Sequence, residues 1–184
     1  MYMWTFRKVD IMNYIRLNFY GIMQHYPPSK YVVTAPSSTY YRTERCPTKS
    51  SIVGLIGASS GYDRDDIRLI ELKNKIDCKY SIIRDGTVIV DFQTVRPIGD
   101  EKFRKVDGGL STGTIIKKVE YLQNYSFNVY VGADDETLKQ IYDALRNPVY
   151  HQYFGKRSCV PSEPIVTDFN VVDLGVLENV YDCP

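Results

Sequence analysis

Closely spaced metal ligands are missing from this 184-residue chain. Its two histidines, His25 and His151, lie far apart, and none of its four cysteines belongs to a CxxC pair. Structural zinc sites usually take their ligands in close pairs, so the sequence argues against a metal centre. Scattered cysteines also favour free thiols in a reducing compartment over a disulfide framework. The cysteines are Cys46, Cys78, Cys159 and Cys183.

Long hydrophobic runs are missing too. No stretch approaches the roughly 20 apolar residues of a membrane span, and the residues before Met12 hold no extended apolar core of a secretory signal. We therefore expect a cytoplasmic protein with no membrane partner. With 43% hydrophobic and 24% charged residues, a chain of this length predicts one domain around one core.

The net charge is small, at +1, but it is unevenly distributed. From Ser162 onward there are five acidic residues and no Lys or Arg, so residues 1–161 hold all 23 cations against 17 acids, a balance of +6. This segregation is typical of a basic body that binds a polyanion, with an acidic tail directed elsewhere. A tail that is solvated, or that docks on its own domain, is an equal alternative.

One glycine-dotted stretch, CPTKSSIVGLIGASSG at residues 46–61, raises the question of a phosphate site. The nucleotide-binding P-loop GxxxxGK[ST] is excluded, because its glycine positions hold Thr43 and Thr48 when Lys49 and Ser50 form the final pair. A more general site survives, since Thr48 or Ser50 can cap a helix whose first amides, with Lys49, bind an anion. The alternative is an ordinary capped helix with a solvated lysine.

Tyrosine is unusually abundant, with sixteen copies. Residues 40–42 and 150–157 place tyrosines beside Arg or Lys. Single-stranded nucleic acids bind such interleaved aromatics and cations, because bases stack on the rings while the cations neutralise phosphates. The sequence therefore favours a single-stranded nucleic acid as ligand, although most of the tyrosines are expected to be core or ordinary surface residues.

Aromatic and β-branched runs predict strands at 13–21 and 125–132. Two more strands within 78–95 are joined at Asp85-Gly86, a dipeptide typical of a tight hairpin turn. Residues 24–47 hold four prolines and predict a long exposed loop. Residues 96–118 hold six cations, three acids and several glycines, and predict a protruding arm.

Helix-capping residues add three helices to this pattern. The first is predicted after Thr48 or Ser50, the second after Asp65 or Asp66, and the third after Asp134 or Asp135, with Pro148 beyond its end. The order of strands and helices predicts an α+β fold. It consists of an antiparallel sheet backed by helices, of the ferredoxin-like or RNA-recognition type.

Several stretches, in order, resemble one family: GIMQ after the first strand, PTKSSIVGLIGASSGYDRDD, DFQTV and NPVYHQYFGKRSCVPS. The chain is similar to the CasD-type subunits of type I CRISPR Cascade complexes, subtype I-E-like. These subunits are members of the RAMP superfamily and bind the 5′ handle of the CRISPR RNA. The similarity extends from Met12 to Pro164.

The resemblance implies a ferredoxin-like RAMP domain over residues 13–161, between an N-terminal extension (1–12) and a short acidic tail (162–184). Helices would lie on one face of its antiparallel sheet, with a β-hairpin thumb inserted at about 96–118. The implied partners are the CRISPR RNA, a CasC-type backbone subunit and a CasA-type large subunit, with target DNA reached only through the complex. The resemblance implies neither a cofactor nor a metal.

It also implies RNA contacts, because an unpaired RNA end is recognised through splayed bases, sugar hydroxyls and phosphates. The predicted helix start would hold handle phosphates, the end of the first strand would read a base or sugar, and the GKRSC stretch would grip the backbone below a stacking tyrosine. Charge and position alone add five further cations. The expected contacts are Gln24, Thr48, Lys49, Ser50, Tyr153, Lys156, Arg157 and Ser158, with Arg42, Arg45, Arg64, Arg104 and Lys105.

Two other functions stay open. Relatives in another subtype cleave CRISPR RNA with tyrosine, lysine and histidine side chains, because metal-free cleavage needs a base for the 2′-hydroxyl and a cation for the phosphate. Here only His25 and His151 could serve, and neither has a sequence-marked lysine partner, so we expect no enzyme and no catalytic residue. The second alternative is a generic single-stranded RNA-binding protein, which would show no preference for a handle sequence.

Overall fold

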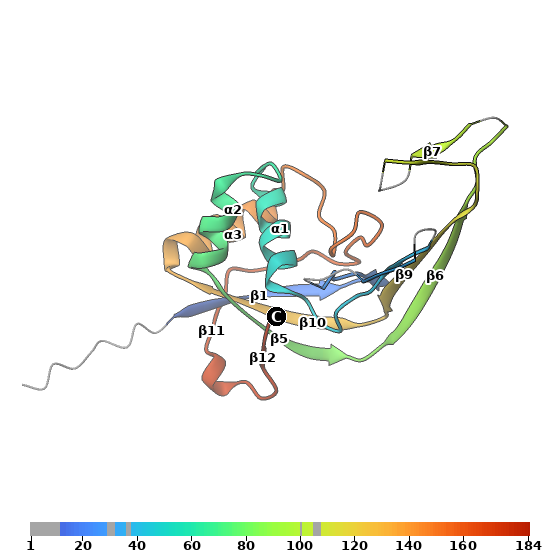
Figure 1. Cartoon of the computed structure of the whole chain (residues 1–184). Coiled ribbons are helices and arrows are strands. Elements are labelled where there is room, and N and C mark those ends of the chain that lie inside the picture. The colour runs from blue at the N-terminus through green and yellow to red at the C-terminus, as the bar shows by residue number, and fades with distance from the viewer. Residues whose placement is uncertain (1–11, 29–31, 36–37, 100, 105–107) are drawn as a thin grey trace, which may run out of the picture.

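The computed structural model describes residues 12–28, 32–35, 38–99, 101–104 and 108–184. These residues form a mixed α+β protein with two larger sheets, whose strands run mostly antiparallel, and three α-helices (Figure 1). The α+β class that the sequence predicts is therefore confirmed.

The first sheet carries the helices and most of the core. β1 pairs antiparallel with β10 along its whole length. Its alternating sequence directs Ile15, Leu17 and Phe19 into the core, where each is at most 2% exposed. The strand order is β11 (Val171–Val172), β1 (Asn13–Tyr20), β10 (Ser126–Ala133), β5 (Asp77–Arg84) and β12 (Tyr181–Asp182).

Three capped helices cover one face of this sheet (Figure 1). The side chains of Thr48, Asp66 and Asp134 each accept a hydrogen bond from an amide of the following first turn. These bonds satisfy donors that have no partner within a helix, and all three residues are among the predicted caps. The helices are α1 (Lys49–Ser59), α2 (Ile67–Lys75) and α3 (Asp135–Arg146).

The second sheet is arranged around β9. One edge of β9 pairs antiparallel with all nine residues of β6, and the other edge pairs antiparallel with β2 and parallel with β4. In Figure 1, β6 and β9 curve together away from the helices. The strands are β2 (Met23–Gln24), β3 (Val32–Ala35), β4 (Ser38–Tyr41), β6 (Thr87–Val95) and β9 (Ile115–Gln123).

The predicted hairpin at Asp85-Gly86 is wrong. Within the described residues β5 pairs with β10 and β12, whereas β6 pairs with β9, so the chain passes from one sheet to the other at residues 85–86. A Cβ on Gly86 would lie 2.0 Å from the carbonyl oxygen of Gln123. Glycine is therefore needed for close approach to the neighbouring backbone, where the chain crosses back from β9 to β10.

The predicted exposed loop at 24–47 is also wrong. This segment contains β3, β4 and the end of β2, and the side chains of Gln24, His25 and Tyr26 are buried. The amide of Tyr26 donates to Thr43 Oγ1 at 2.8 Å, which ties the two ends of the segment together. Prolines exclude a strand only close to their own positions, so four of them did not exclude the short strands between.

The acidic segment after residue 161 docks on the body of the protein, one of the two alternatives for the tail. β11 and β12 become edge strands of the first sheet, and a short 3₁₀ helix, η1 (Leu174–Val176), lies between them. Ile165 and Val166 belong to the hydrophobic core. One of the acids, Asp182, forms an ion pair with Lys79 on β5 at 2.5 Å.

The arm is shorter than predicted. Residues 115–118 belong to β9, so residues 96–114 are the ones that lie beyond the β6–β9 ladder. Within them β7 (Phe103–Arg104) pairs with β8 (Leu110–Ser111), well away from the helices (Figure 1). Lys105 and the predicted extension up to residue 11 lie outside the described residues.

Within the described ranges all four cysteines are free thiols. Burial raises the pKa of Cys78 to about 12, so this thiol stays protonated near neutral pH. The same ranges contain no group of three His, Cys, Asp or Glu side chains placed to hold a metal ion. None of their helices has both the length and the apolar composition that crossing a membrane requires.

Candidate nucleic-acid interface

The start of α1 is largely occupied by the chain itself. Thr48 Oγ1 accepts a hydrogen bond from the amide of Ser51 at 3.2 Å, and the amide of Lys49 donates to the carbonyl oxygen of Pro184 at 2.8 Å. Two of the three first-turn amides therefore have protein partners, so the expected cluster of free amides for an RNA phosphate is wrong. Thr48 is a buried structural cap, and Ser50 Oγ accepts a hydrogen bond from a lysine of α2.

Gln24 is a core residue. Its side chain is fully buried, and Nε2 donates to the carbonyl oxygens of Phe19 at 3.2 Å and Tyr125 at 2.9 Å. Its Oε1 accepts a hydrogen bond from the hydroxyl of Tyr26 at 2.6 Å. The amide thus links the segment around β2 to Tyr125, just before β10, and has no surface on which to meet a ligand. The prediction that Gln24 reads a base or sugar is wrong.

The GKRSC stretch forms a tight loop fastened to the end of β2. The amide of Phe154 donates to the carbonyl oxygen of Cys159 at 2.8 Å. The amide of His25 donates to the carbonyl oxygen of Phe154 at 3.1 Å. Gly155 has a φ of +77°, and a Cβ there would lie 1.7 Å from the His25 carbonyl oxygen, so only glycine fits. This close contact fixes the position from which Lys156 leaves the loop.

Two lysines, one on this loop and one on β9, each lie against a tyrosine ring. Lys156 Nζ donates to the hydroxyl of Tyr121 at 2.6 Å and lies 5.0 Å from the ring centroid. Lys117, on the same face of β9 as Tyr121, lies 5.1 Å from the ring centroid of Tyr41 on β4. Burial lowers the pKa of His25, and the charges of Lys156 and Lys117 also favour the neutral imidazole, whereas its contact with Glu120 favours the charged form. Tyr121 is buried and therefore positions Lys156 instead of offering a stacking surface.

These elements form the strongest candidate for a nucleic-acid interface in the described part of the chain. The next loop residues, Arg157 and Ser158, are exposed, and Tyr153 of the same loop is half-buried. Cations beside accessible rings suit a single strand, because its phosphates and its unstacked bases are both unpaired. We call this region the β9–loop surface, and it consists of Tyr41, Lys117, Tyr153, Lys156 and Arg157.

The other predicted cations lie on separate elements. Arg42 and Arg45 follow β4 and are exposed, with the Arg42 guanidinium 5.7 Å from the ring centroid of Tyr40. Arg64 precedes α2 and Arg104 lies in β7, on opposite parts of the fold (Figure 1). Charge and position in the sequence therefore did not identify one common site.

Lys117 and Tyr121 are the residues that the sequence reasoning missed, whereas Tyr41 belongs to the tyrosine–arginine stretch at 40–42 that it singled out. The predicted arm placed Lys117 outside the sheet. In IIKKVEYLQ, however, Lys117 and Tyr121 are four positions apart, and in a strand such residues lie on the same face. Period-two spacing could have joined these two, but the contact with Tyr41 depends on the parallel pairing of β4 with β9.

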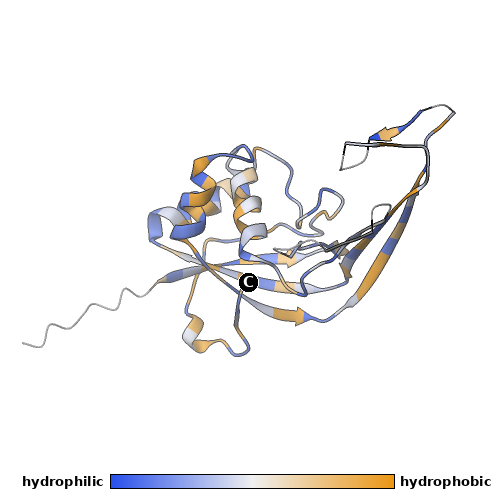
Figure 2. Ribbon diagram, in the orientation of Figure 1, coloured by the Kyte–Doolittle hydropathy of each residue, from blue (hydrophilic) through white to orange (hydrophobic). Residues whose placement is uncertain are grey.

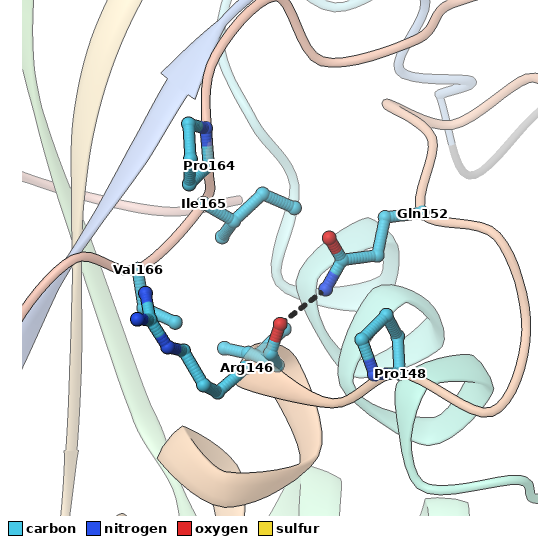
Figure 3. A pocket seen from close by; sticks show the side chains of 7 residues that line it. Arg146, Pro148, Gln152, Pro164, Ile165 and Val166 are labelled. Atoms are coloured by element: carbon cyan, nitrogen blue, oxygen red, sulfur yellow. Dashed lines mark hydrogen bonds between the residues drawn. The ribbon is translucent and has the colours of Figure 1, made fainter.

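A hollow of about 240 Å³ lies beside the end of α3 (Figure 3). Across its wall, Gln152 Nε2 donates to the carbonyl oxygen of Leu145 at 2.9 Å. Arg146 is the one charged side chain that lines it, so the hollow lacks the clustered cations of the β9–loop surface. Its lining residues are Leu145, Arg146, Pro148, Gln152, Pro164, Ile165 and Val166.

Fold and surface together define a mixed α+β protein with a candidate nucleic-acid interface. Residues 32–182 match a family model described as CRISPR-associated protein (Cas_Cas5). The chain is 30% identical over 165 residues to the CRISPR system Cascade subunit CasD of Escherichia coli (strain K12), covering 83% of this chain and 69% of that protein. The chain belongs to the Cas5 family of CRISPR-associated proteins, which confirms the resemblance seen in the sequence.

Solved structures share the fold. A chain of a CRISPR RNA-guided surveillance complex matches with a TM-score of 0.72 and 25% identity, over 89% of this chain and 65% of that one. A crystal structure described as a Cas protein matches with a TM-score of 0.60 and 23% identity, over 88% of this chain and 65% of that one. The chain thus spans 65% to 69% of the length of these relatives.

Proposed function

We propose that this Cas5-family protein is a non-catalytic subunit of a cytoplasmic type I CRISPR Cascade complex and binds the 5′ handle of the CRISPR RNA. The β9–loop surface carries the proposal, because Lys117 and Lys156 lie over tyrosine rings beside an exposed loop cation. The relative from E. coli is named as a Cascade subunit, and the solved relative belongs to an RNA-guided surveillance complex, which supports this role.

The chemistry of the β9–loop surface suits an RNA end without a pairing partner. Phosphates bind Lys117, Lys156 and Arg157, while a splayed base stacks on the accessible ring of Tyr153. Stacking of one base contributes about 1–3 kcal/mol. Contacts with tyrosine rings already order the two lysines, so less side-chain entropy is lost on binding. Secondary contacts are assigned to Ser158, Arg42, Arg45, Arg64 and Arg104.

The strand order favours a ferredoxin-like RAMP fold with a thumb. Along the chain, β1, β5, β10 and β11 are the first, second, third and fourth of these strands. In the sheet they lie side by side in the order β11, β1, β10, β5, which is fourth, first, third, second. Helices follow the first and third of them, as in a βαββαβ unit. We assign the β6–β9 ribbon, with residues 96–114, as the thumb inserted between the second and third strands.

The same assignment suggests where the protein partners bind. Exposed apolar side chains on the thumb, such as Val95, Ile98 and Leu110, would be covered by a CasC-type backbone subunit. A CasA-type large subunit would bind elsewhere on the protein, and target DNA would be reached only through the assembled complex. The shared membership of the relatives in such complexes supports these partners in general.

The geometry favours RNA binding over RNA cleavage. A metal-free ribonuclease needs a base that reaches the 2′-hydroxyl. His25 is 6% exposed, and its Nδ1 lies 2.8 Å from the carbonyl oxygen of Glu120, so it cannot reach a bound strand without uncovering. His151 is exposed, but it lies in the loop after α3 with no lysine in hydrogen-bond contact among the described residues.

The test measures RNA binding by the purified full chain in the absence of metal ions. It compares two RNAs of equal length. The first has already been cleaved from its repeat and carries the natural 5′ handle sequence, called the intact handle; the second carries a scrambled handle. We expect the intact handle to bind at least about tenfold more tightly, a difference of about 1.4 kcal/mol, because base edges are read as well as phosphates. Denaturing gels of the same reactions, and of reactions with uncleaved repeat RNA, should show no new fragments.

Two results would overturn this function. Equal affinity for the intact and the scrambled handle would favour a generic single-stranded RNA-binding protein. Metal-independent fragments that disappear with His25→Ala or His151→Ala would favour the nuclease.

A further inference from the structure

One edge of β6 has no strand beside it. All nine residues of β6 pair with β9, and no other described strand lies along the opposite edge. In an antiparallel strand alternate residues direct their N–H and C=O groups outward, so this edge offers hydrogen-bonding groups over a length of about 30 Å. Long unprotected edges pair readily with other chains.

The side chains of β6 lack the usual protection of an edge strand. Val90 and Phe92 lie on one face and are 51% and 55% exposed, and Figure 2 shows hydrophobic stretches along this strand. The strand contains no lysine and no proline, the residues that commonly prevent pairing at an edge. A further strand beside β6 would cover the apolar side chains and satisfy the outward backbone groups.

The single charge on β6 is Asp91, on the face opposite the two exposed apolar side chains. Its carboxylate accepts a hydrogen bond from Gln93, but no Lys or Arg in the described ranges forms an ion pair with it. Lys117, on the same face, is turned toward Tyr41 on the other side of β9. Opposite charges on adjacent strands are stabilising, so the neighbour that best fits this edge carries a cation opposite Asp91.

A second copy of this chain fits the edge poorly. Antiparallel pairing of β6 with itself over all nine residues would place Asp91 directly opposite its own copy. Like charges facing each other across two strands are destabilising. The edge therefore selects a different sequence, with a cation in the middle of one face and apolar residues on the other.

We propose that the outer edge of β6 binds an extended segment of another protein by β-strand addition. The added strand carries Lys or Arg opposite Asp91 and apolar side chains opposite Val90 and Phe92. Main-chain hydrogen bonds supply affinity, and the alternating side chains supply specificity. This interaction goes beyond RNA binding, because it needs neither the handle nor the lysines of the β9–loop surface. The cation of the added strand would lie on the Lys117 face and extend its positive charge.

The probe is a fluorescein-labelled nonapeptide, Thr-Val-Thr-Val-Lys-Val-Thr-Val-Thr, added to the full chain without RNA and followed by fluorescence anisotropy. We expect saturable binding. Two control peptides carry N-methyl groups on alternate backbone nitrogens, one on the odd positions and one on the even positions. Only the N–H groups of the odd positions or those of the even positions can face β6. One methylated peptide should therefore lose binding while the other keeps it.

Charge reversal tests the pairing with Asp91. Asp91→Lys should weaken binding of the Lys peptide about five- to tenfold, and a peptide with Glu in place of Lys should recover binding to that variant. Asp143→Lys, on the exposed side of α3, is the matched control and should change neither affinity. Thermal unfolding of both variants verifies that they are folded.

Three results would overturn the proposal. They are no binding of the Lys peptide, equal binding of both methylated peptides, or an affinity that Asp91→Lys leaves unchanged. Handle affinity, measured separately, tests the proposed function, so either idea can fail without the other.

Discussion

The start of α1 and the β9–loop surface both combine lysine with a feature suited to phosphate, but they differ in what already occupies them. At α1 the amide of Lys49 is bound to the carbonyl of Pro184, and the amide of Ser51 is bound to Thr48. On the β9–loop surface, Lys156 uses one of its three ammonium donors on Tyr121 and keeps two. The first region uses its donors to hold the fold together, and the second still offers donors to a ligand.

This difference shows that a phosphate-like motif is not a phosphate site until the rest of the chain is placed. The segment that closes the start of α1 lies more than a hundred residues further along the sequence. A helix start needs partners for its first amides, and the docked end of the chain supplies one as well as a ligand would. The Lys–Ser pair after Thr48 predicted the helix correctly and its free amides wrongly.

The largest effect is expected from Gly155→Ala. The new Cβ would collide with the carbonyl of His25, and the positive φ disfavours any other residue, so stability should fall by about 3 kcal/mol or more. Handle binding should fall with it, because the loop that positions Lys156 detaches from β2. Urea unfolding measures the first effect and RNA titration the second.

Gly54→Ala is the matched control, placed in the helix that begins at the other region. A Cβ on Gly54 would meet no atom within 4 Å, so alanine should stabilise α1 by about 0.5–1 kcal/mol. Loss of handle binding in Gly54→Ala, with binding kept in Gly155→Ala, would reverse the comparison and make the start of α1 the RNA site.

A smaller effect separates the lysines of the two regions. The slope of log affinity against log salt should flatten by about 0.7 for Lys117→Ala and for Lys156→Ala, the value for one phosphate on a single strand. Lys49→Ala, like the control Lys139→Ala on α3, should leave the slope almost unchanged. A flatter slope for Lys49→Ala would show that its side chain binds a phosphate although its amide is occupied.

The smallest effect concerns pH and the buried His25. Its folded-state pKa is lowered by burial, so below the unfolded pKa of about 6.5 the unfolded chain binds the proton more strongly. The stability that neutral His25 provides is complete above that pH and is lost as the pH falls below it. Between pH 7.5 and 5.5 the unfolding free energy should drop less in His25→Gln than in the parent. Equal pH profiles for His25→Gln and the parent would contradict the assignment.

Local elements followed closely from the sequence. Each predicted helix is present and begins after one of its predicted caps, and the strands at 13–21 and 125–132 agree with β1 and β10 to within a residue. These features depend on neighbours in the chain, through capping hydrogen bonds and alternating burial. The family could also be recognised, because its motifs occur in order along one stretch.

Pairing between distant segments did not follow from the sequence. The Asp85-Gly86 dipeptide is typical of a tight turn between two paired strands. The strands on either side of it pair elsewhere, β5 with β10 and β6 with β9. Gln24 follows β1 as a ligand-reading residue would, yet it is buried, and its side-chain amide bonds to the distant Tyr125 as well as to its near neighbours Phe19 and Tyr26. In both cases non-local contacts satisfied more backbone and side-chain groups than the local alternative.

By itself the sequence determined the α+β class, the starts of the helices and the family. Only the tertiary structure decided which charges remain available. It placed Pro184 on the amide of Lys49, buried Gln24, and set Lys117 and Lys156 against tyrosine rings of other segments. The physical reason is that capping and periodicity act between near neighbours, whereas the availability of a donor depends on every segment that folds against it.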